Sequence, residues 1–265
     1  MDKIREIYKD DFANYLLCLA LDVGEGMLRN GGEISRVEDT IERICHAYGA
    51  VHVEVFTIIS MINAAVRMPD GSYSSQLRRV RKTDNNFSTL EAFNALSREV
   101  CRTTPTLDRL DEMIKEVKHK CHYPKWEVYL ASAVAALSFA LFFGGSWRDG
   151  AVAFILGTVI AFINKHLPEK VNTMAKTAVS SFIGSLLAVL SVRAGLGESL
   201  DAIMIGIIML LVPGVTFGMA FRDLMYGDLL TGTMKTAQAV IQAIMIAFGY
   251  IMAISIFAII SGGVI

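Results

Sequence analysis

The sequence predicts an α+β cytosolic domain followed by an α-helical membrane bundle of about five spans, the fourth of them interrupted by proline and glycine. Hydrophobic residues make up 53% of the chain and charged residues only 19%, below the roughly 25% charge that is usual in soluble domains. Of the 51 charged residues, 37 lie in residues 1–125, and long apolar stretches follow Pro124. We therefore expect a cytosolic domain at 1–124 and a membrane domain at 125–265.

Two amphipathic helices open the first domain. Apolar residues recur at helical spacing over residues 12–27 and again over 37–48, and Gly49 is a typical helix stop. Ser35 and Glu38 have the spacing of a capping box, in which each side chain accepts a backbone N–H at the start of the helix. We therefore expect Ser35 to cap the second helix.

Strands and further helices complete the first domain. Valines alternate with other residues in the first strand, and Pro69 with Gly71 predicts a turn between the second strand and the third. Ser88 and Glu91 form a second possible capping box. Two or three strands are expected, from the segments 51–56, 58–68 (with a break near Ser60 or Asn63) and 73–80, and further helices at 88–102 and 107–121.

Five apolar stretches make up the membrane domain, at 127–143, 151–167, 174–194, 200–212 and 234–260. A hydrocarbon core about 30 Å thick needs about 20 helical residues, and four of the stretches come close to this length. The fourth is short, ends at Pro213-Gly214 and continues as an apolar segment over 215–221. This pattern indicates a discontinuous helix, whose freed backbone groups must face protein, water or ligand rather than lipid.

Basic residues beside the spans alternate in number along the chain, as 3, 1, 3, 1 and 2. Because positively charged flanks remain in the cytoplasm, we expect a multi-pass protein of the cell (inner or plasma) membrane, with its N-terminal domain cytoplasmic and its C-terminus outside. The first twelve residues lack an apolar segment, so we expect no cleavable signal peptide.

Small residues recur four apart in the spans. The rows are Ala131/Ala135, Ser180/Gly184/Ala188 and Gly214/Gly218. Such rows allow helices to approach closely, and we expect them to serve packing of the bundle or association between chains.

The strongest candidates for a substrate pathway follow the interrupted span. They are Pro213, Gly214, Thr216, Arg222, Asp223 and Asp228. Charge inside a membrane costs roughly 2.5–3.5 kcal/mol on insertion scales, so it usually faces a cavity or a partner. Arg222 could hold a carboxylate, Thr216 an ammonium or hydroxyl group, and either aspartate a coupling proton. Alternatively, Arg222 and Asp223 lie in an ordinary cytoplasmic loop.

A second group of candidates lies in the first domain. It consists of Gly32, Glu33, Arg36, Glu38 and Asp39. Acids at a helix N-terminus are expected from capping and from the helix dipole, which explains Glu38 and Asp39. Glu33 and Arg36 are less well explained, and a role in gating or in docking a partner is the alternative.

Several other classes of function are disfavoured. A net charge of -1 argues against nucleic-acid binding. One run of basic residues is interpreted instead as a solvated face, or as a face that rests on anionic lipid headgroups. This run consists of Arg78, Arg79, Arg81 and Lys82. His119, Cys121 and His122 lack a fourth ligand at zinc spacing, so we expect no metal. The sequence has no GxSxG, HExxH, Walker A or GxGxxG motif, so we expect neither an enzyme nor a cofactor.

Four segments resemble the threonine/serine exporter family. They are GGEISRVEDTIERICHAYG at 31–49, the valine-rich hairpin, the LxxLDxxI helix at 107–114 and LVPGVTFGMAFRDLMYGDLLTGTMK at 211–235. The resemblance covers essentially the whole chain, including the order of a cytosolic domain and five spans. It implies a secondary exporter of threonine and serine, with motif positions at Gly32, Arg36, Glu38, Asp39, Pro213, Gly214, Arg222, Asp223 and Asp228.

The resemblance also implies a partner. Fused family members carry ten spans, so a chain with five implies a second small membrane subunit of similar topology or a homo-oligomer. Two-component relatives are implied to export dicarboxylates such as succinate, so a dicarboxylate exporter subunit is the first alternative to an exporter of small amino acids. A membrane-anchored regulatory or scaffold protein is the second, although five spans exceed what anchoring requires.

Overall fold

The computed structural model describes residues 11–81, 85–120, 124–168 and 171–260. The expectations about Lys82, Cys121, His122 and a signal peptide concern segments outside these residues. The chain divides into two compact units, a first unit of Met1–His122 with Met219–Met234 and a second unit of Tyr123–Gly218 with Lys235–Ile265. Helices α10 (Gly214–Met225) and α11 (Leu229–Ile260) therefore contribute residues to both units.

An antiparallel sheet forms one layer of the first unit. Its strands are β1 (His52–Ile58), β2 (Met61–Arg67) and β3 (Tyr73–Arg79), in the order β1-β2-β3. Of the two or three strands expected, the structure has three, and the break lies near Ser60 rather than Asn63. The register places Asn63 of β2 between Phe56 of β1 and Leu77 of β3.

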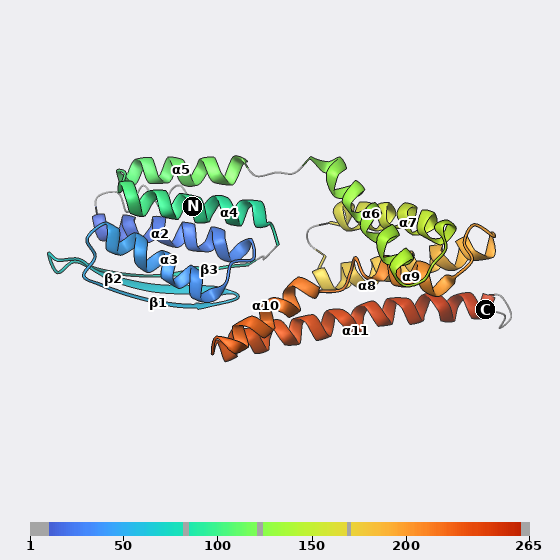
Figure 1. Cartoon of the computed structure of the whole chain (residues 1–265). Helices are drawn as coiled ribbons and strands as arrows, with labels where there is room; N and C mark the ends of the chain where they lie inside the picture. The colour runs from blue at the N-terminus through green and yellow to red at the C-terminus, as the bar shows by residue number, and fades with distance from the viewer. Residues whose placement is uncertain (1–10, 82–84, 121–123, 169–170, 261–265) are drawn as a thin grey trace. The chain divides into compact units, whose positions relative to one another are not determined.

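Four helices stack on one face of this sheet. Helices α2 (Phe12–Arg29) and α3 (Ile34–Ala47) cover the sheet, and α4 (Phe87–Thr103) and α5 (Leu107–Lys120) form the next layer (Figure 1). Helix α2 is central, and its side chains are buried along most of its length. The core of the unit includes Leu16, Met27, Ile41, Ile62, Phe93 and Ile114.

Neither expected capping box forms. Helix α3 has no side-chain cap, Ser35 is exposed, and Glu38 instead accepts the N–H of Thr57 in β1 at 2.7 Å. Helix α4 is capped by Asn86 rather than Ser88, through the N–H of its third residue at 3.1 Å. A tertiary partner in the first case, and an earlier capping residue in the second, replace the local pairing.

One arginine of the basic run lies inside the first unit. Arg78 of β3 forms an ion pair with Asp22 of α2 at 3.1 Å, with side chains 14% and 1% exposed, and lies 3.9 Å from Glu25. For Arg78, the interpretation as a solvated or lipid-facing residue is wrong. Arg79 and Arg81 are exposed.

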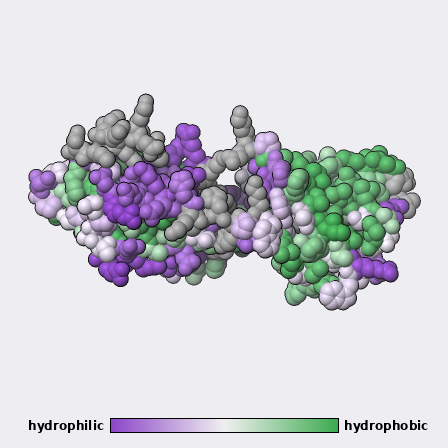
Figure 2. Space-filling model, turned by 90° about the horizontal axis from the view of Figure 1, so that it is seen from above, coloured by the Kyte–Doolittle hydropathy of each residue, from purple (hydrophilic) through white to green (hydrophobic). Residues whose placement is uncertain are grey.

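The described part of the second unit is helical. It contains α6 (Lys125–Phe142), α7 (Trp147–His166), α8 (Thr173–Arg193) and α9 (Leu200–Ile208), together with the first residues of α10 (214–218) and most of α11 (235–260). Helices α7, α8 and α11 are long and apolar enough to span a membrane, whereas the apolar part of α6 is shorter. Hydrophobic residues dominate the surface of this unit in Figure 2, and hydrophilic residues dominate that of the first.

Small residues set the spacing of helices in the second unit. A Cβ atom on Gly157 of α7 would lie 2.8 Å from the carbonyl oxygen of Ser132 in α6, and one on Gly249 of α11 would overlap the backbone of α8. The hydroxyl of Ser181 in α8 donates to the carbonyl of Ile246 in α11 at 2.8 Å. These contacts bring helix backbones close together, but they are made by residues outside the rows expected from the sequence.

The Gly214/Gly218 row differs from these contacts. A Cβ atom on either glycine would meet nothing within 4 Å. Among the residues that the structure describes, this face of α10 therefore packs against no neighbour, and the pair is not a close seam within this chain.

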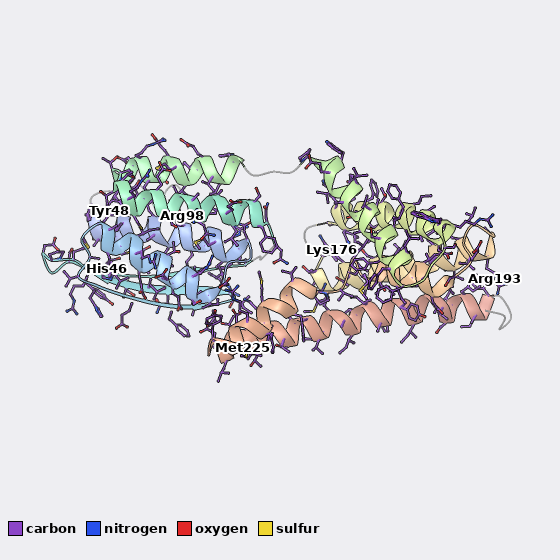
Figure 3. The ribbon with its side chains drawn as sticks, in the orientation of Figure 1. His46, Tyr48, Arg98, Lys176, Arg193 and Met225 are labelled. Atoms are coloured by element: carbon purple, nitrogen blue, oxygen red, sulfur yellow. The ribbon has the colours of Figure 1, made fainter. Side chains whose placement is uncertain are left out.

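Cations at both ends of α8 are held by neighbouring groups (Figure 3). The ammonium of Lys176 donates to the carbonyl of Leu167 at 3.2 Å, and the guanidinium of Arg193 lies 5.2 Å from the ring centroid of Phe257 in α11. Basic side chains at the two ends of an apolar helix are typical of a span whose ends reach the membrane interfaces.

Candidate functional site

The turn between α10 and α11 belongs to the first unit. Gly227 has φ +91°, a conformation that favours glycine, and the N–H of Asp228 donates to the carbonyl of Asp223 at 2.9 Å. A Cβ atom on Gly232 would lie 2.6 Å from Cγ of Leu224, so the two helices are in close contact just beyond the turn. The end of α10 and the start of α11 thus form a tight helical hairpin.

An ion pair connects this hairpin to the start of α3. Nη1 of Arg222 lies 2.6 Å from Oε1 of Glu33, whose side chain is 22% exposed, and Nε of Arg36 lies 4.0 Å from the other oxygen of Glu33. The Arg222 guanidinium also lies 5.6 Å from the ring centroid of Tyr226. The structure thereby joins residues from the two candidate groups, which are far apart in the sequence.

A pair of carboxylates accompanies this ion pair. Burial raises the pKa of Glu38, the N–H of Thr57 opposes that rise, and the negative charge of Asp228 raises the pKa further. Glu38, buried beside a second negative charge, therefore holds a proton more readily than an isolated glutamate does. The arrangement can therefore take up a proton at a higher pH than an exposed acid.

Arg222 and Asp223 both lie in helix α10 rather than in a loop. Asp223 is 3% exposed and is engaged by neighbouring groups. A buried carboxylate is costly unless its surroundings compensate the charge.

The helix interruption lies in the second unit. Helix α9 ends at Ile208 and α10 begins at Gly214, and the side-chain amide of Gln242 in α11 donates to the carbonyl of Leu211 at 3.1 Å. A backbone group released by the break is thus satisfied by protein, as the bilayer requires. Sequence reasoning missed Gln242, although a glutamine inside an apolar stretch is a usable signal.

The six expected pathway residues are therefore divided between the units. Pro213, Gly214 and Thr216 lie at the interruption, in the second unit. Arg222, Asp223 and Asp228 lie in the hairpin, in the first unit, with Glu33 and Glu38.

The remaining members of the cytosolic group have separate roles. Gly32 donates its N–H to the carbonyl of Met27 at 2.9 Å, and a Cβ atom there would lie 2.8 Å from the same oxygen, so the turn after α2 requires a glycine. Asp39 pairs with Arg43 on the same helix at 2.8 Å.

Asp149 is a further buried acid that sequence reasoning missed. Its carboxylate accepts the N–H groups of Glu198 at 2.6 Å, Ser199 at 2.9 Å and Ser146 at 2.8 Å. It thereby ties the start of α7 to the start of α9. The signal was present in the sequence, because Ser146 and Asp149 have the spacing of a capping box, and this box does form.

The chain is similar to known transport proteins over nearly its whole length. The model of the ThrE family, described as "Putative threonine/serine exporter", matches residues 18–257. A "Probable threonine/serine exporter" of Mycobacterium tuberculosis is 24% identical over 243 residues, which cover 90% of this chain and 46% of the relative. This chain thus spans about half the length of that protein.

Two further relatives are of similar length to this chain. Each is a "Probable succinate transporter subunit YjjP". The one from Klebsiella aerogenes is 23% identical, with 86% of this chain and 89% of the relative covered. The one from Escherichia coli K12 is 21% identical, with 90% and 93% covered. No solved structure matches the chain.

Proposed function

The chain belongs to the threonine/serine exporter family, and we propose on that basis that it is one subunit of a secondary exporter of threonine and serine. The first unit lies in the cytoplasm and the second in the cell membrane. A second small membrane subunit, or another copy of this chain, completes the transporter. The match in length to relatives named as subunits supports this assembly.

The observation that carries the proposal is the pair of features joined by α10. This helix begins at the interruption, where the Leu211 carbonyl is held by Gln242, and its last turn contains Arg222, which pairs with Glu33. Interrupted helices in transporters present backbone groups to the substrate. In our proposal the substrate passes the interruption near Thr216. The Arg222–Glu33 pair acts as a gate at the cytoplasmic end of the pathway: the end is closed when the pair is formed and open when it is broken.

Glu38 and Asp228 are the proposed site of the coupling proton. The pKa of Glu38 is raised by burial and by the charge of Asp228. Protonation removes the repulsion between the two carboxylates, so it favours a closed contact between α3 and the hairpin. A proton gradient can then bias that contact.

Export of a dicarboxylate is the second candidate. The relatives that this chain nearly matches in length are named as succinate transporter subunits. A dianion requires a net positive pathway, whereas a zwitterion such as threonine requires groups of both signs. Competition between the two solutes for the same carrier separates these candidates.

Efflux from proteoliposomes tests the proposed function. The purified chain is reconstituted alone and together with a candidate small membrane subunit, and release of labelled threonine, serine and succinate is compared with empty vesicles. We expect release of threonine and serine, inhibited by excess of either. Release of succinate alone would select the second candidate, and no release in any preparation would favour the scaffold alternative.

Variants of the ion pair test the gate. We expect Arg222→Gln and Glu33→Gln each to slow efflux at least tenfold, and the exchange of both charges, Arg222→Glu with Glu33→Arg, to restore part of the rate. Arg148→Gln is the matched control, because Arg148 forms an exposed pair with Glu198 at 3.2 Å elsewhere. Equal efflux in all these variants would remove the pair from the mechanism.

A further inference from the structure

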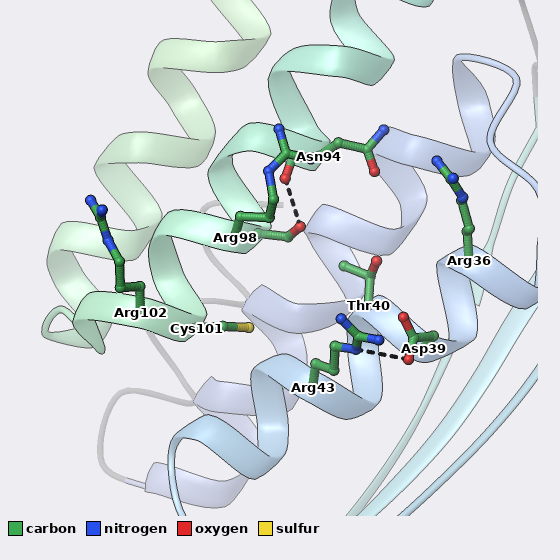
Figure 4. Close-up of a pocket in the computed structure, with 9 residues that line it drawn as sticks. Arg36, Asp39, Thr40, Arg43, Asn94, Arg98, Cys101 and Arg102 are labelled. Atoms are coloured by element: carbon green, nitrogen blue, oxygen red, sulfur yellow. Dashed lines mark hydrogen bonds and ion pairs between the residues drawn. The ribbon is translucent and has the colours of Figure 1, made fainter.

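A cavity of about 630 Å³ lies between α3 and α4 in the first unit. Residues spaced three or four apart line it from each helix, so one face of α3 and one face of α4 form its walls (Figure 4). Its volume falls within the range of sites for small molecules, roughly 300–1,000 Å³. The Arg222–Glu33 pair does not line it.

The lining is strongly basic. Four arginines contribute to it, Arg36 and Arg43 from α3 and Arg98 and Arg102 from α4, against one acid, Asp39. Asp39 already pairs with Arg43 at 2.8 Å. Arg98 and Arg102 are exposed, and within the described ranges no carboxylate lies within ion-pair distance of either, so no acidic side chain balances their charge.

Polar groups supplement the arginines. Thr40, which is 9% exposed, and Asn94 line the cavity, and the Cys101 thiol lies close enough to Arg43 and Asp39 for both charges to act on it. Guanidinium groups bind carboxylate and phosphate oxygens through paired N–H donors. Several such groups around one cavity suit a molecule that carries more than one oxyanion.

We propose that this cavity binds a small soluble molecule with two or more carboxylate or phosphate groups. Such a ligand neutralises Arg98 and Arg102 and bridges α3 to α4. A solvated basic face would need neither the buried Thr40 nor a concave wall shared by two helices. The cavity does not include the Arg222–Glu33 pair, but its Arg36 lies 4.0 Å from Glu33. A bound ligand gives the first unit a means of responding to a cytoplasmic metabolite.

Calorimetry on the full chain in neutral detergent tests this proposal with citrate and pyrophosphate as probes. We expect at least one of them to bind with a dissociation constant below about 1 mM, and threonine, a zwitterion, not to bind the cavity. Arg98→Gln and Arg102→Gln should each weaken binding about tenfold, because each removes a charged hydrogen bond. The affinity of Arg98→Lys, which keeps the charge but loses the paired donors, should lie between those of the native chain and Arg98→Gln.

Arg67→Gln is the matched control, because Arg67 is exposed on β2 and lies outside the cavity. Equal weakening in this variant would show that the probes respond only to overall charge and would overturn the proposal, as would the absence of binding by both probes. Equal binding of short-chain phosphatidylglycerol would assign the cavity to a lipid headgroup and also overturn it.

Alkylation of Cys101 gives a second readout that does not depend on heats of binding. Burial raises the pKa of the Cys101 thiol, so its reaction with N-ethylmaleimide is slow and sensitive to access. We expect the probe that binds to slow this reaction several-fold in the native chain and not in Arg98→Gln. Protection that persists unchanged in Arg98→Gln would contradict the proposal. Efflux does not enter either assay, so its outcome is independent of the proposed transport function.

Discussion

The Glu38 side chain makes both a structural hydrogen bond and an electrostatic interaction. Its carboxylate accepts the N–H of Thr57, which binds α3 to β1, and lies near enough to Asp228 for their charges to interact. Because its pKa is raised in the folded chain, the folded state holds this proton more tightly than the unfolded state does. Ionisation of Glu38 therefore lowers stability as the pH rises from about 4.5, its ordinary pKa, through its raised value.

Glu38→Gln tests the direction of this pH dependence of stability. Glutamine keeps an oxygen for the Thr57 N–H and removes the charge, so the variant should be more stable than the native chain at neutral pH and should lose this advantage as the pH falls toward 4.5. Thermal unfolding in detergent between pH 4.5 and 8 measures the difference, with Glu91→Gln as an exposed control on α4. A difference that does not change with pH would contradict the assignment.

The buried Arg78–Asp22 pair makes a prediction about stability. Removing one partner of a buried pair typically costs about 3–5 kcal/mol, and Lys118, 4.0 Å from Asp22, would compensate only part of the charge left there. We expect Arg78→Leu to lower the free energy of unfolding by this order, measured by urea denaturation of the full chain in detergent. Arg79→Leu, at the next and exposed position, should change it little, and similar losses in both variants would contradict a specific role for the pair.

At the scale of elements, the periodicity of hydrophobic residues was sufficient to predict the positions of several strands and helices. The strands β1 to β3 and helix α5 lie close to the expected ranges, because alternation and 3-4 spacing report burial directly. The starts of α3 and α4 were not predictable in the same way. Ser35 and Ser88 have capping spacing, but the tertiary contact of Glu38 and the earlier position of Asn86 decide where the helices begin.

Glycines in the second unit give a paired prediction. Gly249 leaves no space for a Cβ atom between α11 and α8, whereas Gly218 faces open space. We expect Gly249→Val to destabilise the chain by about 1–3 kcal/mol, the usual cost of overpacking, and Gly218→Val to leave its stability nearly unchanged. Thermal unfolding in detergent measures both, and equal losses would show that α8 and α11 do not meet in this way.

At the scale of the whole molecule, the uneven distribution of charge predicted a polar part followed by an apolar one. It could not predict that residues 219–234 belong to the first unit. Contacts between distant segments, such as that of Arg222 with Glu33, produce no repeating pattern of residues from which they could be predicted. The candidate residues were therefore identified in two groups, without a reason to join them.

A cross-link tests this association. In a chain lacking its native cysteines, Glu33→Cys and Arg222→Cys should be joined by a short flexible bismaleimide, giving one product of altered mobility after proteolytic cleavage between the units. The Glu33→Cys chain without the second cysteine is the control. A product of the same mobility and yield in this control would show that the product does not report contact between residues 33 and 222.

Helix α11 contains 32 residues and at 1.5 Å per residue is about 48 Å long, well beyond the hydrocarbon thickness of about 30 Å. Within the second unit, Gln242 holds the Leu211 carbonyl and Gly249 lies against the backbone of α8. These two residues are seven apart, so at 100° per residue they lie within about 20° of one face of the helix. Inserting one alanine between them would turn Gly249 by about 100° relative to Gln242, whereas inserting four would leave an offset of only about 40°. Both contacts of α11 thus depend on the same helical phase.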